Sequence, residues 1–569
     1  MLIFHRLRRM AAALLLVPLL AGIQPLTAAE RTQTANVVTV TSLADPPEDL
    51  DDVPKTVRGD LLLASDGNVY FASTGGGKGF GGVGRARFDG TQPDGTLEVV
   101  HAFADDGSEG LSSYGGLTQA SDGNLYGTTF FGGDDDDSVG TVFKLTLAGE
   151  YTQIHNFVID DNKDPRKPYT GVVEGPDGNL YGTTLEGGDS QRGTIYRVST
   201  TGTFSVVHQF GGGNNDGSTP EGQLIVGGDG KLYGTTMLGG SSDRGVIYRI
   251  STDGTYEQLY SFPPLRSFNE LGLATNSTGA NPRAGLMLSA DGSYYGTTYQ
   301  GGAGGNGTLY RMTLDSDGSA SVTLVRAFQG GPFEAGFPLS TVTQGPDGNF
   351  YGTSLHGGYG YNFGLGDAGY SDSGTVWRVA HDGSSAELLH SFFGSKADGS
   401  QPYAGVLFID GVPYAIGSSD DTASSGMIIR LQTDTGSGLP VDLAISSKEI
   451  EVGESITITW NASGASTCDK SGAWDEPADE SDPEHITPVS GSRNIIPGIG
   501  VYTYMLSCTD ANDVVHHAFV GVLVNPPVLD TVDGGEIVGG GGTLSWLLLA
   551  LFAALLLRKL IKETRCSCP

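Results

Sequence analysis

Two acidic or aromatic segments contain the side chains best suited to bind a ligand. One is the run Asp134, Asp135, Asp136 and Asp137, and carboxylate oxygens are ligands that calcium prefers. The other carries acidic residues among four rings that can stack on sugars, Tyr359, Tyr361, Phe363 and Tyr370. Solvated acidic loops are the default interpretation of these segments, and glycan or calcium binding is the alternative. No cofactor other than such a calcium ion is expected.

Two other recurrent side chains have structural explanations. A histidine lies two residues before a phenylalanine in four of the units, at His101, His155, His208 and His390. Tyrosine, arginine or threonine occupies the equivalent position in the other units. A metal site would not tolerate these replacements, so packing is predicted. A basic residue also recurs, at Lys144, Arg197, Arg249, Arg311, Arg378 and Arg430. We expect it to pair with the Asp of a nearby Asp-Gly turn.

The sequence contains none of the common catalytic motifs. It has no Gly-x-Ser-x-Gly elbow, His-Glu-x-x-His pair or phosphate-binding loop. Acidic residues are numerous enough to provide a pair of glycosidase carboxylates, but the sequence does not select which two. No catalytic residue is therefore predicted.

The elements that position these segments come from seven repeats. The run Asp122-Gly-Asn-Leu-Tyr-Gly-Thr-Thr129 recurs from Asp177, Asp229, Asp291 and Asp347, and weaker copies begin at Asp66 and Asp410. Each complete unit has four short strand-like runs, which is typical of a propeller blade. The last unit has no fourth run, whereas residues 36–43 form an unassigned strand that we expect to complete it. The prediction is an all-β, seven-bladed β-propeller over residues 30–435, with a linear β-solenoid as the alternative.

The repeat resembles the GloVer tandem repeat of secreted bacterial proteins, described as choice-of-anchor because different sorting tails follow the same repeats. The matching features are the Asp-Gly-Asn-Leu-Tyr-Gly-Thr-Thr core, the pair Gly132-Gly133, the run from Gly140 and a closing His-x-Phe. The resemblance covers about residues 60–431. It implies architecture and a surface location, and it supplies no catalytic residues.

Loop lengths predict where binding occurs on this scaffold. The first-to-second and third-to-fourth connections of each unit are short, whereas the second-to-third loops and the links between units are long. Strand alternation places the long loops on one face. Binding residues concentrate on loops held by a rigid scaffold, so this face is the expected binding surface.

A second, smaller β-domain is predicted over residues 436–527. Runs at 441–446, 455–460, 501–508 and 518–524 alternate like sandwich strands, and the stretch resembles a bacterial immunoglobulin-like domain. Cys468 follows the Trp460 strand instead of lying within it, so the strand order stays open. Cys468 and Cys508 are the candidate disulfide of an exported chain.

Both ends of the chain carry targeting features. Arg6, Arg8 and Arg9 precede an apolar run that ends near Ala29, which predicts a secretory signal peptide over residues 1–29. At the other end a Gly-rich linker (528–542) leads into a short hydrophobic helix with a basic tail (543–569).

The C-terminal segment resembles the GlyGly-CTERM sorting signal of Gram-negative bacteria. The resemblance rests on Gly539, Gly540, Gly541 and Gly542, the apolar helix and its basic end. It implies cleavage by the intramembrane protease rhombosortase and delivery to the cell surface. The tail from Glu563 departs from the usual pattern, and a plain membrane anchor is the alternative.

Net charge limits the partners. Without its two terminal signals the chain has 25 basic and 64 acidic residues, a net charge of −39. Such a surface repels phosphate backbones, so nucleic acid is not an expected partner. The expected partners are the export machinery, the sorting protease, the membrane at least before processing, and a polysaccharide or surface protein.

Three functions follow from these features. The first is a non-catalytic, exported binding or adhesion module at the cell surface. The second is a secreted propeller enzyme, a glycan hydrolase or lyase, because one fold hosts many functions. Tyr, Asp or Glu side chains with perturbed pKa values at the central channel would favour it. The third is a structural surface-layer protein, which would self-associate and bind no ligand.

Overall fold

The computed structural model describes most of the chain between residues 35 and 525. The described ranges are 35–42, 56–76, 80–89, 92–104, 106–133, 138–159, 163–269, 273–330, 334–358, 374–392, 400–418, 427–433, 442–447, 449–472, 489–497, 500–509 and 515–525. All regular structure in these ranges is β, which confirms the all-β prediction for them. None of them contains a helix long and apolar enough to cross a membrane. The predicted signal peptide, Gly-rich linker and C-terminal helix lie outside them.

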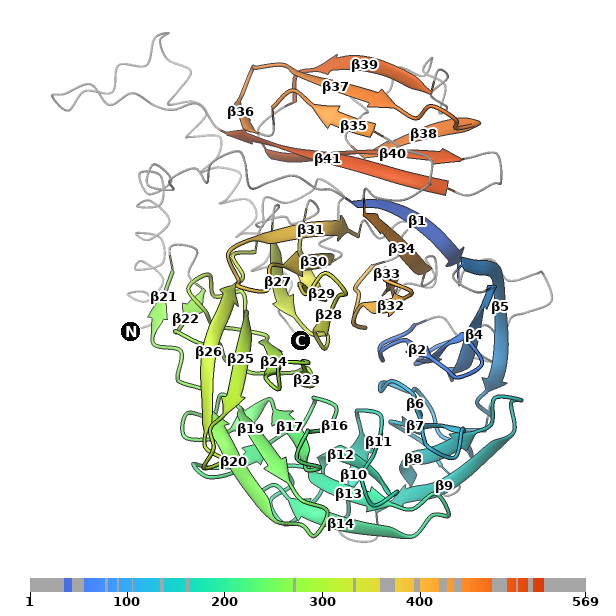
Figure 1. Ribbon diagram of the computed structural model, residues 1–569, viewed down its shortest axis with the longest axis vertical. Helices are drawn as coiled ribbons and strands as arrows, with labels where there is room; N and C mark the ends of the chain where they lie inside the picture. Colours follow the sequence, from blue (N-terminus) through green and yellow to red (C-terminus); the bar gives the residue numbers. More distant parts are fainter. Residues whose placement is uncertain are drawn as a thin grey trace, which may run out of the picture.

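Seven antiparallel sheets lie around a common centre (Figure 1). The first three contain β2 (Leu62–Leu63), β3 (Val69–Ser73), β4 (Gly82–Asp89) and β5 (Gln92–Ala102); β6 (Thr118–Gln119), β7 (Leu125–Thr129), β8 (Ser138–Leu145) and β9 (Tyr151–Val158); and β11 (Val173–Glu174), β12 (Leu180–Glu186), β13 (Thr194–Val198) and β14 (Phe204–Gln209).

The next three sheets repeat this order. They contain β16 (Ile225–Val226), β17 (Leu232–Thr236), β19 (Val246–Ile250) and β20 (Tyr256–Ser261); β23 (Met287–Leu288), β24 (Tyr294–Thr298), β25 (Thr308–Leu314) and β26 (Ala320–Ala327); and β28 (Thr343–Gln344), β29 (Phe350–Gly357), β30 (Thr375–Val379) and β31 (Ala386–Ser391). In each of these six units the two-residue first strand lies nearest the centre (Figure 1).

The seventh sheet is completed by the start of the chain. It contains β32 (Leu407–Ile409), β33 (Val412–Gly417) and β34 (Met427–Thr433), and β1 (Ala35–Ser42) pairs antiparallel with β34 from Ala35↔Thr433 to Ser42↔Met427. The prediction that the N-terminal strand completes the last unit is confirmed. Pairing of β1 removes an exposed sheet edge, which would otherwise be available to other chains.

The hydrophobic core is divided into clusters that lie between neighbouring sheets. Leu61 and Phe71 of the first sheet pack against Tyr414 and Ile416 of the seventh. Six further clusters join the other neighbouring sheets in the same way. Because each buried aromatic or aliphatic side chain contributes about 1.5–3 kcal/mol, the sheets stabilise one another mainly through these faces.

The Asp of the repeat organises the turn between the first two strands. Asp122 accepts hydrogen bonds from the Asn124 backbone N–H (3.0 Å) and the Tyr126 hydroxyl (2.8 Å). The predicted basic partner is confirmed in three units, at 3.5 Å for Lys144 with Asp122, 3.0 Å for Arg311 with Asp291 and 3.9 Å for Arg378 with Asp347. In the fourth unit Arg249 pairs instead with Glu257, which lies on the neighbouring strand (2.7 Å).

The glycine of the repeat makes room for a ring. The close approach at Gly127 lies within one sheet. A Cβ on Gly127 would lie 2.5 Å from Phe143 Cζ, on the adjacent strand of the same sheet. Tyr196, Tyr248, Tyr310 and Trp377 lie opposite the equivalent glycines.

Three of these rings bury a hydroxyl that has no hydrogen bond within the part of the chain that the structure describes, at Tyr196, Tyr248 and Tyr310. A buried unsatisfied polar group costs about 1–3 kcal/mol. We expect Tyr248→Phe to raise the free energy of unfolding at pH 7, measured by chemical denaturation. Burial also raises the pKa of Tyr248. Above about pH 10 the unfolded chain therefore loses this proton before the folded chain does, and the wild-type protein becomes less stable as pH rises. The Phe variant has no such proton and should not show this loss. A less stable variant would contradict this account.

The second domain is a two-sheet sandwich. One sheet contains β35 (Asp442–Ile445), β37 (Ile456–Asn461) and β39 (Ser490–Ile495); the other contains β36 (Glu449–Glu451), β38 (Thr467–Gly472), β40 (Gly500–Thr509) and β41 (Val515–Asn525). Ile456, Ile458, Tyr504 and Val522 form the core between them. β1 also pairs with β41, at Val37↔His517 and Val38↔His516, so one strand belongs to the seventh sheet and to the sandwich (Figure 1).

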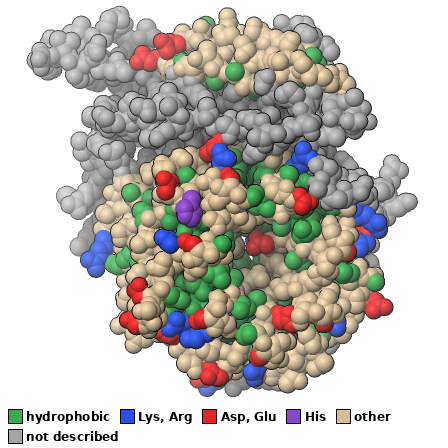
Figure 2. Space-filling model, in the orientation of Figure 1, with side chains coloured by type: hydrophobic (Ala, Val, Ile, Leu, Met, Phe, Trp, Pro, Cys, Tyr) green, Lys and Arg blue, Asp and Glu red, His purple; other side chains and the backbone are tan. Residues whose placement is uncertain are grey.

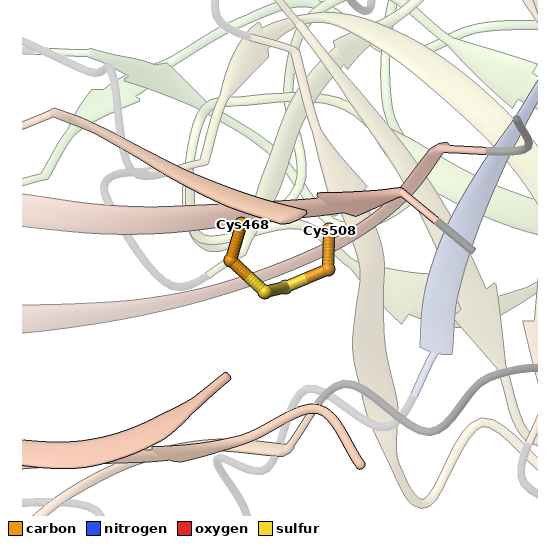
Figure 3. Close-up of a disulfide and its surroundings, with 2 residues drawn as sticks. All are labelled: Cys468 and Cys508. Carbon is orange, nitrogen blue, oxygen red and sulfur yellow. A yellow bond between two sulfur atoms is a disulfide. The ribbon is translucent and has the colours of Figure 1, made fainter. Parts of the chain in front are cut away.

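The predicted disulfide between Cys468 and Cys508 is present (Figure 3). The two residues lie directly opposite each other on β38 and β40, with a Cα–Cα distance of 4.0 Å. The bridge therefore joins neighbouring strands of one sheet, whereas the antibody disulfide joins two sheets. This explains why Cys468 follows the Trp460 strand in sequence.

Candidate functional site

The residues predicted to bind a ligand lie outside the described ranges. They are Asp134, Asp135, Asp136 and Asp137, and Tyr359, Tyr361, Phe363 and Tyr370. Among the residues that the structure does describe, no group of three or more His, Cys, Asp or Glu side chains could hold a metal ion. Calcium binding at the acidic loop stays a prediction.

The recurrent histidines pack between sheets, as predicted. The ring of His101 stacks on Tyr151 at a centroid distance of 4.4 Å, and His155 stacks on Phe204 at 3.9 Å. Burial lowers the pKa of His155 to about 4, so its ring is neutral at pH 7. His208 stacks on Tyr256 and also contacts Asp216 (3.2 Å).

The long links and the second-to-third loops lie on the same face, as the loop lengths predicted. The link before each unit pairs with the end of that unit's second strand. The pairs include β10 (Arg166–Pro168) with β12, β15 (Gly217–Ser218) with β18 (Leu238–Gly239), and β27 (Ala335–Pro338) with β29. Isolated bridges take the same place in other units, such as Leu111↔Phe131 and Ala280↔Gln300. These pairs fix the position of each link just before the chain enters the first strand of the next unit.

A sharp turn then sends the links before the second to seventh units toward the centre. The turning residue has a left-handed backbone although it is not glycine, with φ values of 58° at Ser112, 60° at Lys167, 57° at Thr219, 58° at Asn281, 56° at Phe337 and 45° at Gln401. Such a conformation costs about 1 kcal/mol or more and persists only where neighbours hold it. Backbone bonds from the preceding unit hold it here, for example from the Thr219 N–H to Arg192 O (3.0 Å).

The first threonine of the Thr-Thr motif anchors the link of the next unit. The Thr128 hydroxyl donates to Thr170 O (2.8 Å), and Thr235 donates likewise to Ala284 O (2.8 Å). In the sixth unit Thr353 donates to Ala404 O (2.9 Å). A motif that marks the repeat thus also positions the residues at the centre.

One residue per unit lies four positions before the innermost strand, and we call these seven the mouth residues. In the second to seventh units this residue lies two positions after the left-handed turn. They are Arg58, Tyr114, Tyr169, Glu221, Arg283, Leu339 and Tyr403. All are partly exposed, and the ring of sheets is hollow at its centre in the space-filling view (Figure 2). Most core positions repeat from unit to unit, whereas the mouth residues are of four types, Arg, Tyr, Glu and Leu.

Arg58 lies between two tyrosine rings of the mouth. Its guanidinium carbon is 4.4 Å from the ring centroid of Tyr403 and 5.1 Å from that of Tyr114. These side chains come from the first, seventh and second units, so their contact joins the two ends of the ring of sheets. Tyr114 also stacks on Tyr169 (5.4 Å), and Phe130 packs against both.

The opposite side of the mouth carries an ion pair. Arg283 Nε donates to Glu221 Oε2 (2.5 Å), and the Glu221 side chain is only 9% exposed. The Arg283 guanidinium also lies 5.2 Å from the ring centroid of Tyr299. Within the described ranges, the two terminal nitrogens of Arg283 make no hydrogen bond.

The electrostatics of Tyr169 show that the mouth residues act on one another. Burial raises the pKa of Tyr169. The nearby Glu221 and Tyr114 raise this pKa further, whereas the positive charges of Arg283 and Arg58 lower it. The hydroxyl is therefore protonated at neutral pH and can donate a hydrogen bond. Tyr169 belongs to the third unit, and the charges that shift its pKa belong to Arg58 of the first unit, Glu221 of the fourth and Arg283 of the fifth.

Two positions further along, a second layer lines the axis with mostly small residues. It contains Asp60, Gly116, Gly171, Gln223, Gly285, Thr341 and Gly405. Asp60 accepts a hydrogen bond from the Gly405 N–H (2.6 Å), which again joins the first and seventh units. Burial raises the pKa of Asp60, although Gly405 and Thr341 bind its carboxylate.

We expect Asp60→Asn to preserve the fold and to change its pH dependence. Because the pKa of Asp60 is higher in the folded protein than in the unfolded chain, the folded protein holds this proton to a higher pH. The wild type therefore loses stability as pH rises from about 4 through the folded-state pKa. Asparagine can keep the bond from Gly405 and removes the titration. In thermal unfolding from pH 4 to 8, the unfolding midpoint of the variant should rise relative to that of the wild type as pH increases. Parallel pH curves would contradict the burial of this carboxyl.

The sequence prediction does not include the mouth residues because the recognisable repeat motif is centred on the Asp-Gly turns. The mouth residues lie in the links between units, which vary in length and sequence. The usable signal is a short pattern in the third to seventh units, a proline followed by any residue and, three positions after that residue, Leu or Val, as in Pro168-Tyr169-Thr170-Gly171-Val172. The residue after the proline is large and changes from unit to unit, whereas the position that follows it is small in all seven units.

Comparison with known proteins supports the repeat family over part of the chain. Residues 57–270 match the family model described as Gloeobacter/Verrucomicrobia repeat. No curated protein matches the sequence.

Similar solved structures include an extracellular domain, a lyase and a lectin. The extracellular domain of BT4673 from B. thetaiotaomicron shares 10% identity, with 87% of this chain and 59% of that chain covered and a TM-score of 0.43. The polysaccharide lyase Uly1 shares 11% identity (71% and 98% covered, TM-score 0.37). The BP39L lectin from Burkholderia pseudomallei shares 11% identity (70% and 91% covered, TM-score 0.25). The chain thus spans less than two thirds of the first of these, and similarity this distant carries no functional argument.

Proposed function

We propose that the chain is an exported surface module that binds a glycan at the mouth residues. The seven sheets are the blades of a closed seven-bladed β-propeller, and the mouth residues surround the long-loop end of its central channel. The observation that carries the proposal is the convergence of Arg58, Tyr114, Tyr169 and Arg283 at an axial position whose residue type varies between units.

The chemistry of the mouth suits a sugar. Stacked aromatic rings pack against the apolar face of a pyranose, and the guanidinium and hydroxyl groups beside them hydrogen-bond its hydroxyls. Tyr114, Phe130 and Tyr169 provide such a wall. The β-scaffold holds these rings in place, so little conformational entropy is lost when a ligand binds.

The two ends of the chain give the module its location. We propose that residues 1–29 direct export and are removed, and that residues 543–569 hold the chain at the membrane until a sorting protease releases it. The sandwich then separates the propeller from the point of attachment. Mass spectrometry of the mature protein tests both cleavages, and an intact C-terminal helix would favour a permanent anchor.

Equilibrium binding to a broad glycan panel, with and without calcium, tests the binding function. The protein is the chain from Glu30 onward, kept in detergent. Saturable binding should weaken at least tenfold in Tyr114→Ala and Tyr169→Ala, because each removes a stacking surface. Ile496→Ala, at a 60% exposed side chain in the second domain, is the control.

Two outcomes would contradict the proposal. Loss of binding in Tyr359→Ala/Tyr361→Ala, with no effect at the mouth, would move the site to the loop predicted from sequence. Absence of binding to every glycan would exclude a carbohydrate ligand, and self-association measured by sedimentation would then favour a surface-layer role.

One observation favours an enzyme as a second candidate. Tyr169 has a raised pKa and lies within electrostatic reach of Glu221 and Arg283, and perturbed titratable groups are typical of catalytic sites. Incubation with each bound glycan, followed by analysis of new chain ends, tests this function. An enzyme should lose turnover in Tyr169→Phe while it keeps its affinity.

A further inference from the structure

The charge of the mouth differs from that of the rest of the chain. The exported part carries a net charge of −39, yet the seven mouth residues include two arginines and one glutamate. A net positive group within an acidic surface attracts a small anion to that point, while the surrounding surface repels long polyanions. We infer that the mouth binds a glycan end that carries a carboxylate, a terminal uronic acid. This inference rests on the proposed function.

Arg58 is oriented for such a group. Tyr403 and Tyr114 stack on its guanidinium at 4.4 and 5.1 Å, and stacking uses the faces of the group. A guanidinium has five N–H donors in its own plane, and a fork of two of them matches the two oxygens of a carboxylate. The tyrosines therefore fix the plane in which a carboxylate would be bound.

Arg283 provides a second set of donors across the mouth. The nearly buried Glu221 accepts from Nε and so fixes the orientation of the guanidinium. The two terminal nitrogens make no hydrogen bond with the described residues. Because a guanidinium has five N–H donors, Arg283 can bind an anionic ligand without breaking its pair with Glu221.

The layer below the mouth favours a chain end over a chain that passes through. Gly116, Gly171, Gly285 and Gly405 bring the backbone of neighbouring units close together, and Cβ atoms there would lie within 3.1 Å of other units at all four positions. Asp60, Gln223 and Thr341 are the polar side chains of this layer.

The test compares two forms of one ligand. A series of short oligogalacturonides is matched with the same oligosaccharides after reduction of their carboxyl groups to alcohols. The chain from Glu30 onward, in detergent, should bind the acidic form at least tenfold more tightly, and added salt should reduce this difference because it screens charge. Equal affinity for both forms overturns the inference and leaves the proposed function standing, whereas binding of neither form, together with failure of the glycan panel, overturns both.

Variants locate the effect. Arg58→Lys and Arg283→Lys keep the charge and lose the planar fork, so each should reduce the acidic preference about tenfold with little change in affinity for the reduced form. The matched control is Arg87→Lys, at a 47% exposed side chain that pairs with Glu98. Thermal unfolding confirms that each variant is folded. If the preference survives both mouth substitutions, the carboxylate is bound elsewhere and the inference is wrong.

Discussion

Deletion of residues 30–42 is expected to cause a larger loss of stability than any single substitution in the propeller. It removes β1, which pairs at seven positions with β34 and at two with β41. At about 0.5–1.5 kcal/mol for each hydrogen bond, the loss is roughly 5 kcal/mol before packing is counted. It also exposes β34 as an edge strand, which invites association with other chains. Thermal unfolding should shift down by roughly 10 °C or more, and sedimentation should detect oligomers.

Two controls separate the role of β1 from the effect of shortening the chain. Deletion of residues 30–34 ends before β1 and should leave unfolding unchanged. A synthetic peptide of residues 35–42 should restore part of the lost stability when it is added to the truncated protein. An unchanged unfolding midpoint after deletion of 30–42 would show that the last sheet does not need the N-terminal strand.

A reciprocal exchange of glycine and phenylalanine is expected to give the second largest effect. In the second unit Gly127 lies opposite Phe143, whereas in the first unit Phe71 lies opposite Gly84. The two units thus fill the same space from opposite strands. Gly127→Phe alone places a second ring where Phe143 already lies, which costs about 3 kcal/mol or more. Phe143→Gly alone leaves a cavity, at a cost of about 3–5 kcal/mol.

The double variant Gly127→Phe/Phe143→Gly should recover most of this stability. It reproduces the arrangement of the first unit, so one ring again fills one space. Chemical denaturation of the wild type, both single variants and the double variant forms a complete double-mutant cycle. Additive losses, with the double variant less stable than either single variant, would mean that the neighbouring sheet decides which strand carries the ring.

Much of the fold could be predicted from the sequence because the repeat is local. Asp122-Gly123 forms its turn and Tyr126 reaches back to Asp122 within four residues, so the motif carries its own structure wherever it occurs. The missing fourth strand of the last unit and the unassigned strand at residues 36–43 implied their pairing by count alone. The Cys468–Cys508 bridge followed from having two candidate cysteines in an exported chain.

The candidate site could not be predicted in this way. Arg58, Tyr114 and Tyr403 are separated by up to 345 positions in sequence and meet only because the first and seventh units are neighbours. The disulfide likewise bridges two strands of one sheet, a choice that depends on which strands pair. The division of β1 between the seventh sheet and the sandwich is a contact between domains, and no local pattern encodes it.

The repeat, its turns, its strand count and the bulk of its charge follow from the amino-acid sequence alone, since these depend on near neighbours or on composition. The tertiary structure decided which side chains surround the axis. A residue that follows a left-handed turn points to the centre only when threonine hydroxyls and backbone bonds of the adjacent unit hold that turn in place. The seven mouth residues lie together because packing brings the units around a common centre, and the energy of that arrangement comes from faces buried between neighbouring sheets.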